Sequence, residues 1–289
     1  MKSPLQTMAH MNIHPSKVEA LLMKEQKTSN TSVPLYKFLD MEFYGNVMVG
    51  SPGQNFKVIF DTAWANSWIP SSLCSSFDIA CEIHNQYNAA QSNTHFDNGT
   101  TIVIPLGGYN LTGRLSTDMV HIGKINITDQ TFAEMSYVPW AFVFSKADGV
   151  FGLAFDSYAI DNVTPFFYNM LKQKTVQKPI FSFYMNRDPS SKRAGTLFFG
   201  GVEERHYTGN FTFAKITKKG YWQFRMDSLK VKGYNMTFCR GGCDVIADTS
   251  TNAILGPDNE ISLLNQKIGA KKFFFGRYVV SIKPFEVQD

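Results

Sequence analysis

The sequence is poor in three features that would point to particular classes of protein. It has no run of about 18 apolar residues, so it predicts no membrane span. Its Lys and Arg residues are scattered at a net charge of +4, without the dense basic stripe that a nucleic-acid surface requires. The histidines, including His84, His95, His121 and His206, lack HExxH or paired-carboxylate spacing. We therefore expect no nucleic-acid partner, no metal and no cofactor.

Cysteine is also scarce, with 4 residues that fall into two close pairs. Cys74 lies near Cys81, and Cys239 lies near Cys243. Neither spacing is the CxxC knuckle that is typical of thiolate metal sites. Two short-loop disulfides are the better interpretation, and they indicate an oxidising compartment. Four buried free thiols remain the alternative.

Asn-X-Ser/Thr sequons recur along the chain, and none has proline at the middle position. They predict a glycoprotein of the secretory route, with each asparagine exposed because a glycan is bulky. No apolar segment typical of a signal peptide is visible in residues 1–32. We therefore expect the true N-terminus to lie outside this sequence; a cytosolic protein is the alternative. The sequon asparagines are Asn30, Asn98, Asn110, Asn126, Asn162, Asn210 and Asn235.

Short alternating segments separated by turn residues predict a mostly β protein, and at 289 residues the chain can form a large core. Helices are expected only from Thr164, as N-cap, to Lys174, and from Pro257 to Ile268, before a terminating glycine at Gly269. The predicted strands are 36–50, 56–60, 101–105, 113–122, 180–186, 196–200, 209–216, 222–232 and 245–247.

Two segments repeat one pattern, in which an apolar strand runs into Asp-Thr and a later Pro. The first is VIFDTAWANSWIP at 58–70, and the second is VIADTSTNAILGP at 245–257. Matching strand-to-turn contexts suggest two related lobes that bring Asp61 and Asp248 together. Neighbouring carboxylates cannot easily both ionise, so they share a proton and titrate as a pair. Such a pair can take a proton from water and donate one to a carbonyl oxygen.

The chain resembles the pepsin-like aspartic proteases over about residues 33–280. The resemblance includes YGNVMVGSPGQNFKVIFDT, the cysteine-containing CSSFDIACEIHNQYN, ADGVFGLAF, FFGGVEERHYTGNFTF and CRGGCDVIADT. It implies a bilobal β fold with a cleft, and endopeptidase activity on peptides or proteins at acidic pH. It also implies a monomer that is lysosomal or secreted. The expected organisation is a propeptide remnant or tail at 1–32, an N-terminal lobe at 33–186 and a partial C-terminal lobe at 187–289.

The resemblance assigns roles to individual residues. Asp61 and Asp248 match the catalytic aspartates, and Thr62 and Thr249 match the threonines that join the two loops by mutual hydrogen bonds. Gly152 matches the glycine that packs under the first loop. Trp68 matches the indole that partners a tyrosine of the flap, the hairpin that closes over substrate. Thr251 matches a hydroxyl that hydrogen-bonds the second aspartate.

The chain departs from the family at several of these sites. Ala63 and Ser250 replace the glycines of Asp-Thr-Gly, crowd the loops and leave less room for the catalytic water; a positive φ there would strain both residues. Trp64 replaces a small hydroxyl residue, and Leu106 stands at the position of the flap tyrosine. Only 41 residues follow Asp248, fewer than in the family, so an incomplete second lobe is expected. The function predicted is acidic endopeptidase; the alternative is an inactive or impaired homologue that serves as a binding or storage glycoprotein.

Overall fold

The computed structural model describes residues 31–279, except 40, 107, 187, 189, 190, 192, 232–235 and 273–277. The predicted propeptide remnant at 1–30 and the asparagines Asn30 and Asn235 lie outside these residues. The chain divides into two compact units, residues 1–224 with 246–252 and residues 225–245 with 253–289. Asp61-Thr62 and Asp248-Thr249 both lie in the first unit. The lobe boundary expected at residue 186 stays a prediction.

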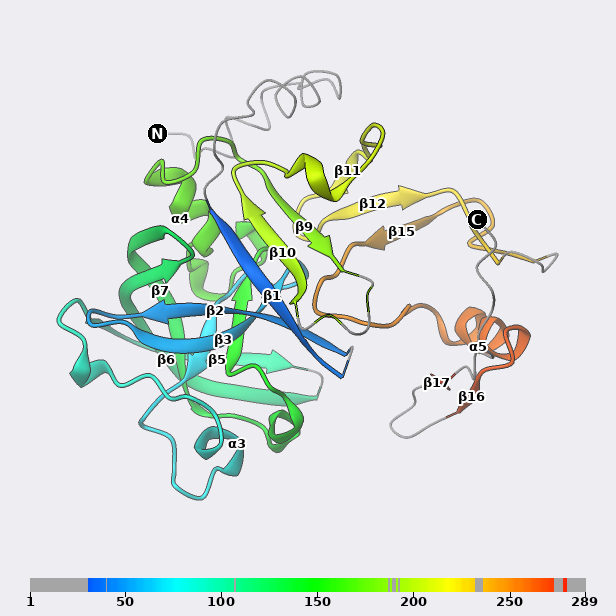
Figure 1. Ribbon diagram of the computed structural model, residues 1–289. Helices are drawn as coiled ribbons and strands as arrows, with labels where there is room; N and C mark the ends of the chain where they lie inside the picture. The colour runs from blue at the N-terminus through cyan, green and yellow to red at the C-terminus, as the bar shows by residue number, and fades with distance from the viewer. Residues whose placement is uncertain are drawn as a thin grey trace. The chain divides into compact units, whose positions relative to one another are not determined.

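A sheet of ten strands dominates the first unit (Figure 1). Its order is β5-β6-β7-β4-β8-β3-β2-β1-β10-β9, and an extra pairing of β6 with β2 folds the sheet back on itself. Within it, β3 and β8 are parallel, as are β4 and β7. The strands are β1 (Ser32–Phe38), β2 (Glu42–Val49), β3 (Gln54–Asp61), β4 (Trp68–Pro70), β5 (Phe96–Leu106), β6 (Tyr109–Ile122), β7 (Ile125–Tyr137), β8 (Gly149–Gly152), β9 (Phe181–Met185) and β10 (Arg193–Phe199).

The remaining strands are short. One sheet has the order β11-β12-β15, and two further pairs are β13 with β14 and β16 with β17. Their bounds are β11 (Ile216–Lys218), β12 (Gln223–Met226), β13 (Leu229–Lys230), β14 (Thr237–Phe238), β15 (Cys243–Ile246), β16 (Lys271–Lys272) and β17 (Tyr278–Val279). The α-helices are α3 (Ile79–Glu82), α4 (Phe166–Lys172) and α5 (Asp258–Lys267). The prediction of a mostly β protein is confirmed. No helix in the described part of the chain combines the length and apolar character that a membrane crossing requires.

The core of the first unit forms because alternate residues of its strands face inward. In β3, Phe56, Val58 and Phe60 are buried and belong to one large apolar cluster. Alternation puts such residues on one face of a strand. Helix α4 adds Phe166 and Met170 to the same cluster. This cluster supports the strand that ends at Asp61.

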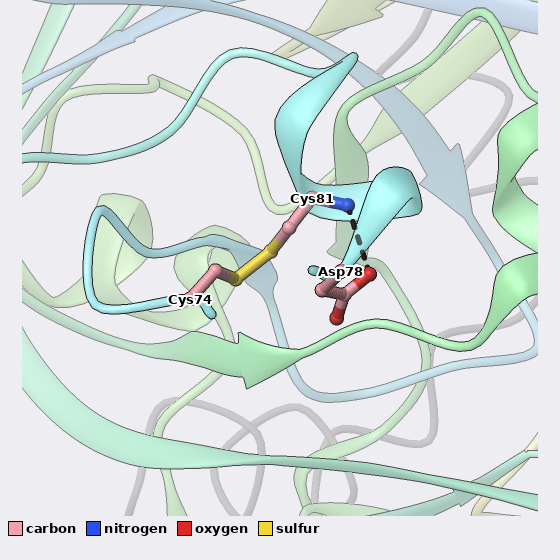
Figure 2. A group of neighbouring side chains, drawn as sticks. All are labelled: Cys74, Asp78 and Cys81. Atoms are coloured by element: carbon pink, nitrogen blue, oxygen red, sulfur yellow. Dashed lines mark hydrogen bonds between the residues drawn. A yellow bond between two sulfur atoms is a disulfide. The ribbon is translucent and has the colours of Figure 1, made fainter. Parts of the chain in front are cut away.

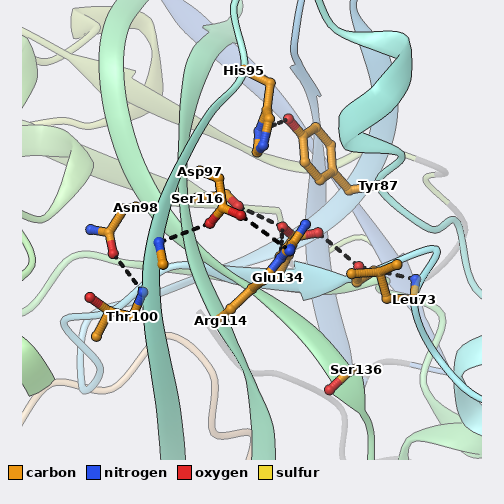
Figure 3. A network of polar contacts seen from close by, with 12 residues as sticks. Leu73, Tyr87, His95, Asp97, Asn98, Thr100, Arg114, Ser116, Glu134 and Ser136 are labelled. Atoms are coloured by element: carbon orange, nitrogen blue, oxygen red, sulfur yellow. Dashed lines mark hydrogen bonds and ion pairs between the residues drawn. The ribbon is translucent and has the colours of Figure 1, made fainter.

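A polar network links β6 and β7 (Figure 3). The carboxylate of Glu134, on β7, is 1% exposed and accepts from Arg114 Nε at 2.7 Å. It also accepts from the hydroxyls of Ser116 and Ser71, at 2.5 and 2.7 Å. Arg114 also pairs with Asp97 at 3.3 Å. A buried carboxylate needs such partners because burial removes its hydration. The network ties β6 and β7 to the segment that follows β4.

Several local expectations were wrong. The segment expected as one strand at 36–50 forms two, β1 and β2, and the one at 222–232 forms β12 and β13. In the segment 209–216 only Ile216 belongs to a strand. Helix α4 begins after Pro165 rather than after a Thr164 cap. The carbonyl of Thr164 instead accepts from Gln130 Nε2 at 3.0 Å. Strand β7 was not expected; Asp129, at φ 51°, shifts the phase of its alternation and hides the pattern.

The second predicted helix lies where it was expected, and the described sequons have the exposure that was expected. Helix α5 spans Asp258–Lys267, and Gly269 follows at φ +72°, the left-handed conformation that glycine adopts readily after a helix. The described sequon asparagines are all exposed, as a glycan requires: Asn98, Asn110, Asn126, Asn162 and Asn210. Their glycosylation stays a prediction.

Candidate active site

Asp61 is the last residue of β3 and lies opposite Gly152 of the parallel strand β8. The turn that follows Asp61 is bonded to the end of β8. Leu153 N donates to Asp61 O at 2.7 Å, and Ala154 N donates to Trp64 O at 2.9 Å. These two bonds fix the backbone that carries the first carboxyl group.

Gly152 is required by this close approach. A Cβ at position 152 would overlap the carbonyl group of Ala65 and lie 2.6 Å from Trp64 O. Gly152 N also donates to the hydroxyl of Ser67, at 3.3 Å. The glycine therefore lies directly against the loop that follows Asp61.

The two threonines exchange hydrogen bonds between the Asp-Thr segments. Thr62 Oγ1 accepts from Thr249 N at 3.0 Å and donates to Ala247 O at 2.7 Å. Thr249 Oγ1 accepts from Thr62 N at 3.1 Å and donates to Phe60 O at 2.5 Å. Each hydroxyl thus bonds the backbone of the opposite segment. This mutual bonding holds the turns that carry Asp61 and Asp248 side by side.

The two carboxyl groups have unequal sets of donors. Asp61 Oδ1 accepts from Ala63 N at 2.7 Å. Asp248 Oδ1 accepts from both the backbone N and the hydroxyl of Ser250, each at 2.8 Å. Its Oδ2 accepts from Thr251 Oγ1 at 2.7 Å. The asymmetry follows from the sequence, because neither Ala63 nor Trp64 offers the hydroxyl that Ser250 and Thr251 supply.

Burial is the main reason that the pKa of Asp61 is raised to about 6. The hydrogen bond from Ala63 N opposes this rise, and the nearby charge of Asp248 adds to it. A carboxyl group with such a pKa keeps its proton under acidic conditions. Asp61 can then donate a proton, which is one of the two roles that general acid–base chemistry requires.

The two positions where glycine was expected carry no left-handed strain. Neither Ala63 nor Ser250 is among the residues with positive φ. The strain that a positive φ would have caused therefore does not apply. What remains at these positions is the effect of the added side-chain atoms.

The two tryptophans near Asp61 lie in the second apolar cluster of the first unit. Trp68 is 1% exposed and packs edge to face on Phe142, with ring centroids 5.2 Å apart. Trp64 is half-buried and packs against the same cluster. Its indole Nε1 is buried without a hydrogen-bond partner among the described residues. The ring of Trp64 therefore packs against apolar side chains of this cluster.

Leu106 lies at the tip of the β5–β6 hairpin, where it pairs with Tyr109. Leu106 is half-buried and contacts the second apolar cluster, whereas Tyr109 is 47% exposed. The leucine can exclude water at this position but offers no hydroxyl. The role of Leu106 as a flap residue stays a prediction.

Both predicted disulfides are present, and the alternative of free thiols is wrong, since no described cysteine is free. Cys74 and Cys81 lie beside Asp78 (Figure 2). This trio is no metal site, because both sulfurs are bonded to each other. Asp78 instead caps α3 by accepting from Cys81 N at 3.2 Å, and it accepts from Val138 N at 2.9 Å. Cys239 and Cys243 close a loop before β15.

Sequence analysis missed two residues that support the site. Ser67 accepts from Gly152 N, as described above. Trp222 donates from its indole Nε1 to Leu153 O at 2.9 Å, one residue beyond β8. Trp222 lies far along the chain, so no local pattern indicates this contact.

Comparison with known proteins gives a consistent set of matches. A family model described as eukaryotic aspartyl protease matches residues 42–287. Cathepsin D of Gallus gallus is 43% identical over 86% of this chain and 62% of its own length. Cathepsin D of Chionodraco hamatus is 41% identical over 88% of this chain and 64% of its own length. Aspartic proteinase A2 of Arabidopsis thaliana is 40% identical over 82% of this chain and 46% of its own length. The chain thus spans less than two thirds of each of these relatives.

Proposed function

Because the chain belongs to the eukaryotic aspartyl protease family, we propose that it is an aspartic-type endopeptidase that acts at acidic pH. The observation that carries this proposal is the pairing of Asp61 and Asp248 through the hydroxyls of Thr62 and Thr249. Catalytic roles for the two aspartates are part of the proposal. The raised pKa of Asp61 supports it, since a general acid must keep its proton at the working pH.

In the proposed reaction, Asp248 accepts a proton from a water molecule as that water attacks the peptide carbonyl carbon. Asp61 donates its proton to the carbonyl oxygen, and a tetrahedral intermediate forms. Asp248 then gives its proton to the amide nitrogen, and one hydroxyl of the intermediate returns a proton to Asp61. The C–N bond breaks, and an amine and a carboxylic acid are released. Side chains alone move the protons in this scheme, without a metal or another cofactor.

The substrate class proposed is an extended peptide or an unfolded protein. The family to which the chain belongs supports this proposal. We further propose that the protein is a monomeric, glycosylated, lysosomal or secreted protease. The two disulfides and the exposed sequons support that setting.

The test is hydrolysis of a denatured protein by the full chain, expressed through a secretory pathway and assayed from pH 3 to 7. Asp61→Asn and Asp248→Asn remove the acid and the base with little change in shape, and each should abolish cleavage. Asp161→Asn is the matched control, because Asp161 is exposed and asparagine tolerates its φ of 56°. Cleavage that survives either dyad substitution would refute the assignment.

A second candidate function follows from the departures at the site. Four residues replace those of the active family pattern: Ala63, Trp64, Ser250 and Leu106. These replacements favour an impaired homologue that acts as a binding or storage glycoprotein. A statine-type transition-state mimic separates the two candidates. Tight binding at pH 4–5 together with cleavage supports the enzyme, whereas binding of peptides without cleavage supports the homologue.

A further inference from the structure

Ser250 places a hydroxyl group at a position where the resembling proteases have only a glycine hydrogen. Its Oγ lies 2.8 Å from Asp248 Oδ1, and its backbone N lies 2.8 Å from the same oxygen. Ser250 is half-buried, as are both aspartates. The hydroxyl is therefore hydrogen-bonded within the site and is not a solvated surface group.

The same hydroxyl also influences the other aspartate. It lowers the pKa of Asp61, against the larger rise that burial causes. Asp61 has no competing hydroxyl of its own, because Ala63 contributes only a backbone N–H.

We infer that the Ser250 hydroxyl occupies the place of the attacking water on the Asp248 carboxylate and slows hydrolysis by competing with that water. A water molecule poised for attack needs the same partners, a carboxylate that accepts its proton and a second carboxyl group beside it. Two oxygen atoms cannot occupy one position at hydrogen-bonding distance from the same carboxylate oxygen. This inference rests on the proposed function, since it concerns the same pair of aspartates.

Water gains access when the Ser250 side chain turns to another staggered rotamer. Asp248 remains partnered during this rotation, because Ser250 N still bonds Oδ1 and Thr251 Oγ1 still bonds Oδ2. The rotation therefore breaks one hydrogen bond to a charged group. The free-energy cost of breaking such a bond restricts the rotamer that admits water to about a tenth to a hundredth of the molecules.

Two substitutions distinguish the effect of the Ser250 oxygen from the effect of the rest of its side chain. Ser250→Ala removes only Oγ, and Ser250→Gly removes Oγ together with Cβ. Both should raise kcat by about tenfold or more, with KM changing less. Both should also tighten binding of a statine-type inhibitor by a similar factor, because the inhibitor's hydroxyl competes for the same position. Ser76→Ala is the control at an exposed serine and should change neither value.

The outcomes distinguish this inference from the proposed function. Inhibitor affinity that rises in both Ser250 variants without cleavage by any protein would support the inference and refute the endopeptidase. Cleavage by the unmodified chain with affinity and kcat unchanged in Ser250→Ala would refute the inference and leave the endopeptidase standing. A gain in Ser250→Gly alone would also refute it, because Cβ and not the hydroxyl would then be the obstacle. A single cooperative thermal unfolding transition verifies that each variant is folded.

Discussion

Replacing Thr62 or Thr249 with valine preserves the branched shape of the side chain and removes one hydroxyl from between the Asp-Thr segments. Thr62→Val leaves Thr249 N without its acceptor and Ala247 O without its donor. Thr249→Val leaves Thr62 N and Phe60 O without theirs. Each substitution therefore removes two hydrogen bonds to the backbone, together with the 3.4 Å hydrogen bond between the two threonine hydroxyls.

The burial of the orphaned groups decides the size of each effect. An unsatisfied buried polar group costs about 1–3 kcal/mol, whereas an exposed one bonds water. Ala247 is exposed, so Thr62→Val mainly orphans one N–H, and we expect a loss of about 2 kcal/mol. Phe60 and Thr62 are 2% and 5% exposed, so Thr249→Val orphans groups in two buried residues, and we expect about 3 kcal/mol. The double variant should lose less than the sum, because the two residues share one network.

Differential scanning calorimetry of the full chain measures these losses. A loss of 1 kcal/mol lowers the midpoint by about 2–4 °C in a chain of this size class, so Thr62→Val should lower it by about 4–8 °C. Thr249→Val should lower it further. Thr208→Val, at an exposed residue, is the control and should leave the midpoint unchanged. Midpoints within about 1 °C of the unmodified chain for both variants, or a larger loss in Thr62→Val, would refute the reasoning from burial.

Three further predictions concern Asp61, Gly152 and the network around Glu134. The folded-state pKa of Asp61 lies above the unfolded value of 3.8, so its contribution to stability is present below pH 3.8 and lost as pH rises through about 6. Urea unfolding should therefore show Asp61→Asn gaining stability relative to the unmodified chain across that window, by at most about 3 kcal/mol, and a pH-independent difference would contradict it. Gly152→Ala should cost about 3 kcal/mol by the same measurement, because backbone surrounds the new Cβ; a loss below about 0.5 kcal/mol would mean that the loop yields easily. Arg114→Leu should cost about 2 kcal/mol through the buried Glu134 carboxylate, and adding Glu134→Gln should recover part of that loss, whereas additive losses would argue against the pairing.

Much of the fold could be predicted because local pattern and tertiary burial agree in many segments. The alternation of apolar residues in β3 predicts a strand, and the glycine after α5 predicts the end of a helix. The sequence could not predict β7, because the left-handed residue Asp129 breaks its alternation, and the strand depends on its neighbour β6 for pairing. The expectation of a strand at 209–216 was wrong for the opposite reason. Its alternation is clear, but strand formation requires a partner, which no local pattern supplies.

The pairing of the two segments could be predicted because the sequence repeats the Asp-Thr motif at 61 and 248. The repeat places two carboxyl groups in equivalent turns, and the threonine hydroxyls join those turns. The support from Trp222 was not predictable, since its indole reaches Leu153 from a distant part of the chain. Such contacts are set by the path of the chain between elements and not by the pattern within any one of them.

Ala63 and Ser250 show why equivalent substitutions in a repeated motif need not have equivalent effects. Both stand where the resembling proteases have glycine, and neither has a positive φ. The backbone N of each donates to the carboxylate two residues earlier, at 2.7 and 2.8 Å. The Ala63 methyl group can only take up space. The Ser250 hydroxyl bonds Asp248 because its χ1 rotamer directs Oγ toward Oδ1, and another rotamer would direct it away. The consequence for the paired aspartates therefore depends on a rotation that the amino-acid sequence does not specify, and a comparison of Ser250→Ala with Ala63→Gly in kcat would measure it.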